Sequence, residues 1–321
     1  MLDLGINMEQ RKLIQHGKSS LTLALPIKWI KERNLKKGDS LYVEKEGNKV
    51  ILSTEEALKI EKISVDVTKL DRTSIMLYVM SLYKFGYNEI EVKFDKPTTM
   101  HYRKNKQASI SSTIHKITNR LIGAEIIEQH ENKIIIKYIA KETGEDFKVI
   151  LRRIFLLLNE TADSLLEGIK NNDKDLIATI EDKHDNINKF VSYCLRLLNK
   201  YGYPDVKKTC FYYHIIASVD KIVDILKYNA RDALKYNKKF NKDTIEIWTQ
   251  INKSIRGYYD FFYNFKMEII DKLGENRDKT KVLLAKKARK IPHEELIYLT
   301  SMKQILEIIL DLTEFRMGLE Q

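Results

Sequence analysis

Cysteine and proline are scarce in this chain of 321 residues, and long apolar runs are missing. Cys194 and Cys210 lack the spacing of a zinc site or a disulfide framework, so we expect two core thiols. No stretch reaches the roughly 18–20 apolar residues that a membrane span needs. The opening MLDLGINMEQ also lacks the charged and apolar regions of a signal peptide. We therefore expect a cytoplasmic protein that does not insert into a membrane.

Catalytic motifs are missing too. The sequence contains no P-loop, no G-x-S-x-G and no H-E-x-x-H, and its carboxylate pairs have no nearby candidate nucleophile. His115 and His130 stand alone, as packing or surface histidines usually do. We expect that the protein is not an enzyme.

Basic residues are abundant, giving a net charge of +11 and a pI near 9.2. The excess is concentrated between Glu9 and Lys37, a stretch that contains eight Lys and Arg residues but only two acidic residues. Such a cluster favours an anionic partner such as nucleic acid. A second basic run, KTKVLLAKKARK at 279–290, is expected to be a solvated helix face.

Proline and glycine divide the chain into three parts. Seven of the twelve glycines precede residue 145, so turns concentrate in the first half and the second half is nearly uninterrupted helix. The four prolines each mark an expected element boundary. The resulting domains are 1–54, 55–142 and 143–321, and the fold class is multidomain α+β.

The first part reads as strand, glycine turn, strand, then a short helix in IKWIKERNL and a hairpin in SLYVEKEGNKVILS. Trp29 and Ile30 lie on the apolar side of the helix. The second part alternates strand KISVDV, helix SIMLYVMSLYKF, strand NEIEVKF, helix ISSTIHKITNRLIG and hairpin AEIIEQHENKIIIKYI. That alternation predicts a small α/β sandwich whose helices cover one face of a sheet.

The third part is a helical bundle by its three- and four-residue apolar spacing. The breaks, including one at Gly274, predict six helices: 145–171, 173–201, 205–237, 242–273, 275–290 and 293–318. Two stretches resemble each other, because each starts at a proline and reaches an acidic pair fifteen or sixteen residues later. The resemblance predicts two related three-helix units, 145–235 and 236–321.

Acidic pairs four residues apart lie on one face of a helix and repel each other. Glu181 and Asp185 form one pair, and Asp220 and Asp224 form a second pair on the next helix. Two converging pairs would offer oxygen ligands to a divalent or ferric ion such as Mg, Zn or Fe. Both pairs border the apolar stripe of their helices, which favours the metal interpretation. The alternative is that water and nearby cations compensate the carboxylates, as on an ordinary solvated helix face.

A third acidic pair, Glu307 and Asp311, is a weaker metal candidate because Lys303 and Glu314 share its face. At the place expected to match the Glu181 pair, the second unit holds Asp260 four residues after Arg256. A symmetric second metal site is therefore not expected.

The first part resembles an AbrB/SpoVT-type domain, in the order strand, Pro, short helix, L-x-x-G-D and hairpin of LTLALPIKWIKERNLKKGDSLYVEKEGNKVIL. The resemblance implies a barrel formed by two chains that exchange hairpins, hence a homodimer. It also implies DNA binding by basic residues of the N-terminal arm and first hairpin. The matching residues here are Arg11, Lys12, His16 and Lys18, with Lys28 and Lys31 as additions. Arg11 is the one arginine among them, and lysine reads guanine edges less selectively, so modest base specificity is expected.

The helical part resembles PhoU proteins in its proline-started helices that carry DKIVD and EIILD. That resemblance implies metal binding through acidic pairs and regulation of phosphate uptake through partner proteins. Together the two parts resemble archaeal phosphate uptake regulators.

Two functions follow from these resemblances. The first is a homodimeric, DNA-binding transcriptional regulator linked to phosphate homeostasis, with a metal- or partner-sensing bundle. The alternative is an adaptor that regulates a phosphate transporter or sensor by protein–protein contact and uses its first part only to dimerise.

Overall fold

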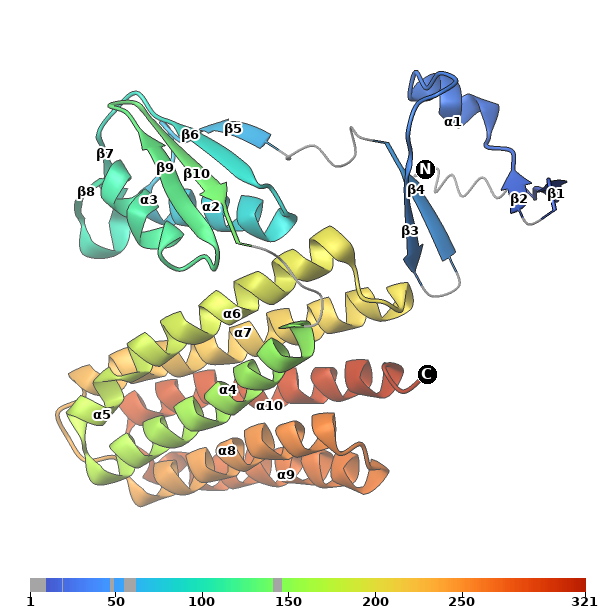
Figure 1. Cartoon of the computed structure of the whole chain (residues 1–321). Coiled ribbons are helices and arrows are strands. Elements are labelled where there is room, and N and C mark those ends of the chain that lie inside the picture. The colour runs from blue at the N-terminus through green and yellow to red at the C-terminus, as the bar shows by residue number, and fades with distance from the viewer. Residues whose placement is uncertain (1–9, 19, 47–48, 55–61, 141–145) are drawn as a thin grey trace. The chain divides into compact units, whose positions relative to one another are not determined.

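The computed structural model describes residues 10–18, 20–46, 49–54, 62–140 and 146–321, and the chain divides into two compact units, Met1–Lys59 and Ile60–Gln321 (Figure 1). The described elements are mixed: small sheets in the N-terminal half and helices in the C-terminal half. This confirms the predicted α+β class.

The first unit contains two hairpins and one short helix. Its elements are β1 (Leu13–His16), β2 (Ser20–Leu23), α1 (Ile27–Glu32), β3 (Tyr42–Glu46) and β4 (Lys49–Ser53). The described strands form two separate antiparallel pairs, β1–β2 and β3–β4, so the exchanged barrel stays a prediction.

Local chemistry explains how the first unit turns. Pro26 stands at the N-cap of α1, where its fixed φ suits the change from strand to helix. Gly38 has a φ of +98°, which favours glycine, and the Lys36 N–H donates to Asp39 Oδ2 at 2.7 Å. These features make the turn that leads from α1 into β3.

The second unit begins with a four-stranded sheet. Its elements are β5 (Lys62–Asp66), α2 (Arg72–Phe85), β6 (Glu89–Lys93), β7 (Thr98–His101), the 3-10 turn η2 (Tyr102–Lys104), β8 (Lys106–Ser109), α3 (Ile110–Thr118), β9 (Ala124–Gln129) and β10 (Lys133–Tyr138). The strand order is β5-β6-β10-β9, with β5 and β6 parallel and β10 antiparallel to both neighbours. Alternate residues such as Val65, Ile90 and Ile134 join buried side chains of α2 and α3 in one core. The short hairpin β7–β8, for which the sequence analysis predicts no element, forms a separate two-stranded pair.

The remaining helices share one large apolar core. They are α4 (Asp146–Asn171), α5 (Lys174–Ala178), α6 (Ile180–Tyr201), α7 (Val206–Lys235), α8 (Lys242–Tyr263), α9 (Met267–Lys287), the 3-10 turn η3 (Ala288–Lys290) and α10 (His293–Gly318). Helices α4, α6 and α7 pack on one another, as do α8, α9 and α10. The packing is consistent with two three-helix units. The units contact each other where α7 packs on α10 and where α4 packs on α8.

Three predictions at this level were wrong. The fourth helix does not reach Gly274; it ends at Tyr263, and Gly274 lies inside α9. The predicted helix 173–201 is interrupted at Thr179 and becomes α5 and α6. Cys194 is buried as expected, but Cys210 is exposed on the first turns of α7. Burial raises the pKa of Cys194 to about 12, which makes it an inert thiol.

The α/β part and the bundle are joined inside the second unit by a buried arginine. Arg196 of α6 is fully buried and donates to the carbonyls of Tyr83 and Tyr87 at 3.0 and 2.8 Å. It also donates to Asn88 Oδ1 at 2.6 Å, and its guanidinium lies 4.3 Å from the centre of the Tyr138 ring. One side chain thus connects α6 to the end of α2 and to β10.

Candidate functional site

The first candidate site is the basic hairpin, which we define as β1–β2 together with Arg11, Lys12, His16 and Lys18. Arg11 and Lys12 directly precede β1, His16 ends it, and Lys18 follows Gly17 in the turn. Gly17 has a φ of +72°, a conformation that suits glycine in a tight turn. All four basic side chains are exposed. The structure therefore brings these predicted residues together on one hairpin.

Helix α1 carries the two additional candidates. Lys28 and Lys31 are three residues apart, so they share one face of the helix, and both are exposed. None of the described residues of α1 is buried within one chain, and Trp29 and Ile30 are only half-buried. The described residues of the chain therefore do not complete the predicted burial of this apolar side.

The second candidate site is the α6–α7 cluster, which we define as Glu181, Asp185, Asp220, Asp224, His184, Asn188, Lys227 and Arg231 with Arg120. It contains all four leading acidic residues predicted from the sequence. They do lie on facing helices, but each already has a side-chain partner within this part of the chain.

A histidine connects the two acidic pairs. His184 is buried, and its Nδ1 lies 3.0 Å from Asp185 Oδ1 while its Nε2 lies 3.0 Å from Asp224 Oδ1. The Lys227 ammonium lies 2.9 Å from the same Nε2 and 2.5 Å from Asp224 Oδ1. Burial alone would raise the pKa of Asp224, but the hydrogen bonds from His184 and Lys227 outweigh it and lower that pKa. Asp224 is therefore ionised at neutral pH.

Arginines neutralise the outer carboxylates. Arg231 forms a two-pronged pair with Glu181, its Nε donating at 2.7 Å, and this hydrogen bond lowers the pKa of Glu181. Arg120, from the segment after α3, pairs with Asp185. Asp220 instead accepts from the Asn188 amide at 3.0 Å, and burial raises its pKa. Each of the other three carboxylates is therefore paired with a basic side chain.

The α6–α7 cluster as arranged does not fit a metal centre. Within the described ranges, no group of three or more His, Cys, Asp or Glu side chains is placed to hold a metal ion. The Lys227 ammonium lies next to His184 and Asp224, at the position that a metal ion bound by these two side chains would occupy. The positive charge that was predicted to come from a metal ion is supplied by three basic side chains, Lys227, Arg231 and Arg120.

The metal prediction can be tested by element analysis of the purified full-length chain. Iron, zinc or magnesium at one equivalent after dialysis would show that Lys227 and Arg231 move aside to admit an ion. A content far below one equivalent is expected for the arrangement described here.

The weaker pair does not form a similar network. Glu307 is half-buried and pairs with two basic residues of α9, Lys281 at 3.0 Å and Arg277 at 3.6 Å, while Asp311 is exposed. Both side chains therefore belong to a solvated, ion-paired helix face, which was the alternative considered for them.

Removing the central ammonium gives a direct prediction for the α6–α7 cluster. Lys227→Met is expected to lower the free energy of unfolding by about 1–3 kcal/mol, because the ionised Asp224 loses a buried charged donor. Urea unfolding followed by circular dichroism measures this. The control is Lys221→Met, an exposed lysine of the same helix, for which a change below about 0.5 kcal/mol is expected. Equal effects of the two substitutions would contradict the role given to Lys227.

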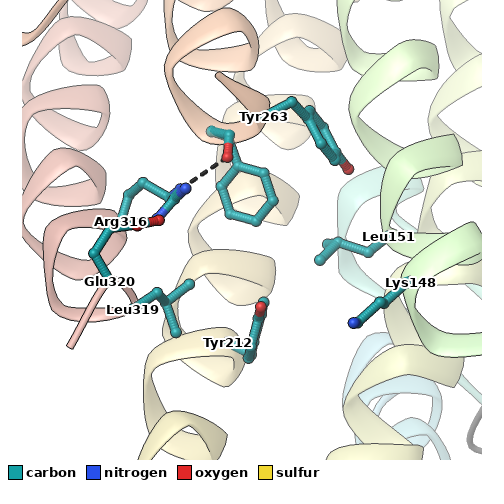
Figure 2. A pocket seen from close by; sticks show the side chains of 8 residues that line it. Lys148, Leu151, Tyr212, Tyr263, Arg316, Leu319 and Glu320 are labelled. Atoms are coloured by element: carbon teal, nitrogen blue, oxygen red, sulfur yellow. Dashed lines mark hydrogen bonds and ion pairs between the residues drawn. The ribbon is translucent and has the colours of Figure 1, made fainter. Parts of the chain in front are cut away.

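A cavity of about 240 Å³ lies at one end of the bundle (Figure 2). Its lining residues are Lys148, Leu151, Tyr212, Phe262, Tyr263, Arg316, Leu319 and Glu320. Arg316 Nε donates to the Phe262 carbonyl at 2.8 Å, and Arg316 Nη1 lies 2.5 Å from Glu320 Oε1. Because the arginine is already held in place and the walls are mainly aromatic and aliphatic, the cavity fits a gap in end packing better than a binding site.

Sequence reasoning missed the basic half of the α6–α7 cluster. His184 stands inside the quoted stretch IEDKHDNIN, yet a single histidine gave no signal by itself. Lys227 and Arg231 follow Asp224 at three and seven residues on the same helical face, and this spacing could have indicated pairing. Arg120 is distant in sequence, so only the fold reveals it.

No family model matches the chain, and no match is found among curated proteins. None of the helices in the described part of the chain is long and apolar enough to cross a membrane.

Proposed function

We propose that this chain is a cytoplasmic, homodimeric DNA-binding regulator linked to phosphate uptake. One observation carries the proposal: in the described part of the first unit, every side chain is exposed or only half-buried, although many are apolar. The following apolar side chains of this unit are 40–68% exposed: Leu13, Ile14, Leu21, Leu23, Ile27, Tyr42, Val43, Val50 and Ile51. A folded domain needs an apolar core, so a second chain is the natural source of the missing half.

The exposed apolar side chains lie on both faces of the first hairpin. Leu13 and Ile14 are neighbours in β1 and point to opposite faces, yet both are more than half exposed. A hairpin of this kind is too small to be stable alone in water. Exchange of hairpins between two chains would cover both faces, which is also what the AbrB-like order of elements implies.

The basic hairpin supplies the chemistry for DNA. Lys12 and His16 are four residues apart along a strand, about 13 Å at the usual rise per residue, and Lys18 extends this row into the turn. In a dimer the row is present twice, which suits the repeated negative charge of a duplex. Lysine and histidine contact phosphates without selecting bases strongly, so modest sequence specificity is proposed.

The link to phosphate uptake is supported by the PhoU-like pattern of the helical part. The experiment that tests it is capture of genomic DNA fragments by the purified full-length protein, scored for enrichment near phosphate-transport genes. Clear enrichment supports a specific regulator. Random recovery would remove the specific role, and absence of any DNA recovery would favour the adaptor function.

Dimerisation gives a separate prediction. Val43→Asp places a charge on a side chain that is 68% exposed in one chain but would be buried between two, so the dimer is expected to dissociate to monomers. Analytical ultracentrifugation measures the mass. The control is Val282→Asp on α9, where the side chain is exposed in the second unit and the mass should stay that of the wild type. A Val43→Asp protein that remains a dimer would contradict assembly through the first unit.

A further inference from the structure

A polar pocket of about 220 Å³ lies in the α/β part of the second unit, between the β7–β8 hairpin and the start of α3. We call it the α3 pocket. It is lined by Arg72, His101, Lys104, Lys106, Gln107, Ala108, Ser109, Ser112, Thr113 and Lys116. Five of these residues are basic and none is acidic.

The backbone forces basic groups together at this pocket. His101 and Lys106 are direct cross-strand partners in the β7–β8 hairpin, so their side chains share one face at close range. Asn105 adopts a left-handed conformation with a φ of +45°, which makes the turn that presents Lys104 and Lys106. The pair places the Lys106 ammonium and the His101 ring side by side at the wall of the pocket.

The lysines and the arginine of the α3 pocket, Lys104, Lys106, Lys116 and Arg72, have no ion-pair partner among the residues that the structure describes. The nearby carboxylate of Asp71 is engaged as the N-cap of α2, where it accepts from the Thr73 N–H at 3.0 Å. The second basic run of the chain differs, because three of its lysines pair with carboxylates: Lys279 with Glu275, Lys281 with Glu307 and Lys287 with Asp243.

A buried histidine lines the same pocket. His101 is 8% exposed, and its ring has no hydrogen-bond partner among the residues that the structure describes. Burial lowers the pKa of His101, and the charges of Arg72 and Lys104 lower it further. Burial and the charges of Arg120 and Arg103 likewise lower the pKa of Arg72. Both shifts are caused first by burial and then by the neighbouring positive charges.

Neutral donors and a helix end complete the pocket. Ser109 caps α3 by accepting from the Ser112 N–H at 3.2 Å, and Ser109, Ser112 and Thr113 all line the pocket beside the first turn of this nine-residue helix. Helix N-termini favour anions. The lining contains no Phe, Tyr or Trp and only one aliphatic residue, Ala108, so it offers no apolar surface for an acyl chain.

We propose that the α3 pocket binds a small phosphoryl anion, either inorganic phosphate or a short inorganic polyphosphate. Tetrahedral phosphoryl groups carry several strong acceptor oxygens that match convergent lysine, arginine and hydroxyl donors. The α3 pocket and the basic hairpin belong to different units of the chain, so the proposal does not rest on DNA binding by the hairpin.

Isothermal titration calorimetry on the full-length chain tests the site, with inorganic phosphate, pyrophosphate, tripolyphosphate and sulfate as separate probes at matched ionic strength. Saturable binding of phosphate or of one polyphosphate, at one per chain, is expected. The pocket variant is Lys106→Glu with Lys116→Glu, both exposed, and it should weaken that binding by about tenfold or more. The control is Lys238→Glu with Lys239→Glu, which changes the net charge equally on the α7–α8 connection and should leave affinity unchanged.

A thermal-unfolding scan confirms that each variant is folded, and it gives a second readout, since a ligand that binds the native state raises Tm. The chain length of the tightest-binding probe separates free phosphate from polyphosphate. The proposal would be overturned if no phosphoryl probe bound saturably at millimolar concentration, or if sulfate bound with the same affinity. It would also be overturned if the control variant weakened binding as much as the pocket variant. The same holds if the pocket variant lost duplex-DNA binding but kept its affinity for the phosphoryl probes.

Discussion

Replacing Arg11, Lys12 and Lys18 together by glutamate is expected to weaken duplex-DNA binding by about 100-fold or more at low salt. All three side chains are exposed around the basic hairpin, and a dimer presents each of them twice. Each substitution removes an attraction to phosphate and adds a repulsion. Electrophoretic mobility shift or fluorescence anisotropy with a labelled duplex measures the loss.

The control for this triple variant must have the same net charge. Lys170, Lys238 and Lys239 are exposed in the second unit, and replacing all three by glutamate changes the charge by the same amount. That protein is expected to bind DNA within a few-fold of the wild type. If both triple variants lose binding equally, overall charge and not the basic hairpin accounts for DNA affinity.

Arg196→Met is expected to lower the free energy of unfolding of the second unit by about 2–4 kcal/mol. Methionine keeps the aliphatic packing but cannot donate to the Tyr87 carbonyl or to Asn88, which Arg196 holds at 2.8 and 2.6 Å. The contact between α2 and α6 should weaken most. Urea unfolding measures the total change, and amide hydrogen exchange should show faster opening of α2 than of the bundle core.

An exposed arginine provides the comparison. Arg256 pairs with Asp163 on the bundle surface with a side chain that is 63% exposed, so Arg256→Met should cost less than about 1 kcal/mol. Similar losses for the two arginines would mean that Arg196 does not join the α/β part to the bundle in the way described.

The helices were predictable where the apolar spacing and the positions of proline indicated the same boundaries. The α4 pattern and the starts of α7 and α10 after Pro204 and Pro292 follow from the sequence, because proline and apolar periodicity mark the same boundaries. Gly274 led to a wrong prediction of the boundary between the fourth and fifth helices. It lies inside α9, where its missing side chain faces open space, whereas the real break at 264–266 contains neither glycine nor proline.

Sites were less predictable than helices, because charge pairing depends on distant residues. The four acidic residues of the α6–α7 cluster could be named from i, i+4 spacing, but their partners Arg120 and His184 gave no separate pattern. The α3 pocket was invisible for a related reason. Its hairpin has strands of only four residues, TTMH and KQAS, and these segments lack the apolar alternation that identifies a strand.

The central claim is that the dimeric first unit binds DNA through phosphate contacts. Its most direct test is fluorescence anisotropy of a labelled duplex titrated with the full-length protein at several salt concentrations. Saturable binding is expected, with the logarithm of affinity falling linearly against the logarithm of salt concentration by about 0.9 per neutralised phosphate. No saturable binding at low salt, or an affinity that does not change with salt, would contradict the claim.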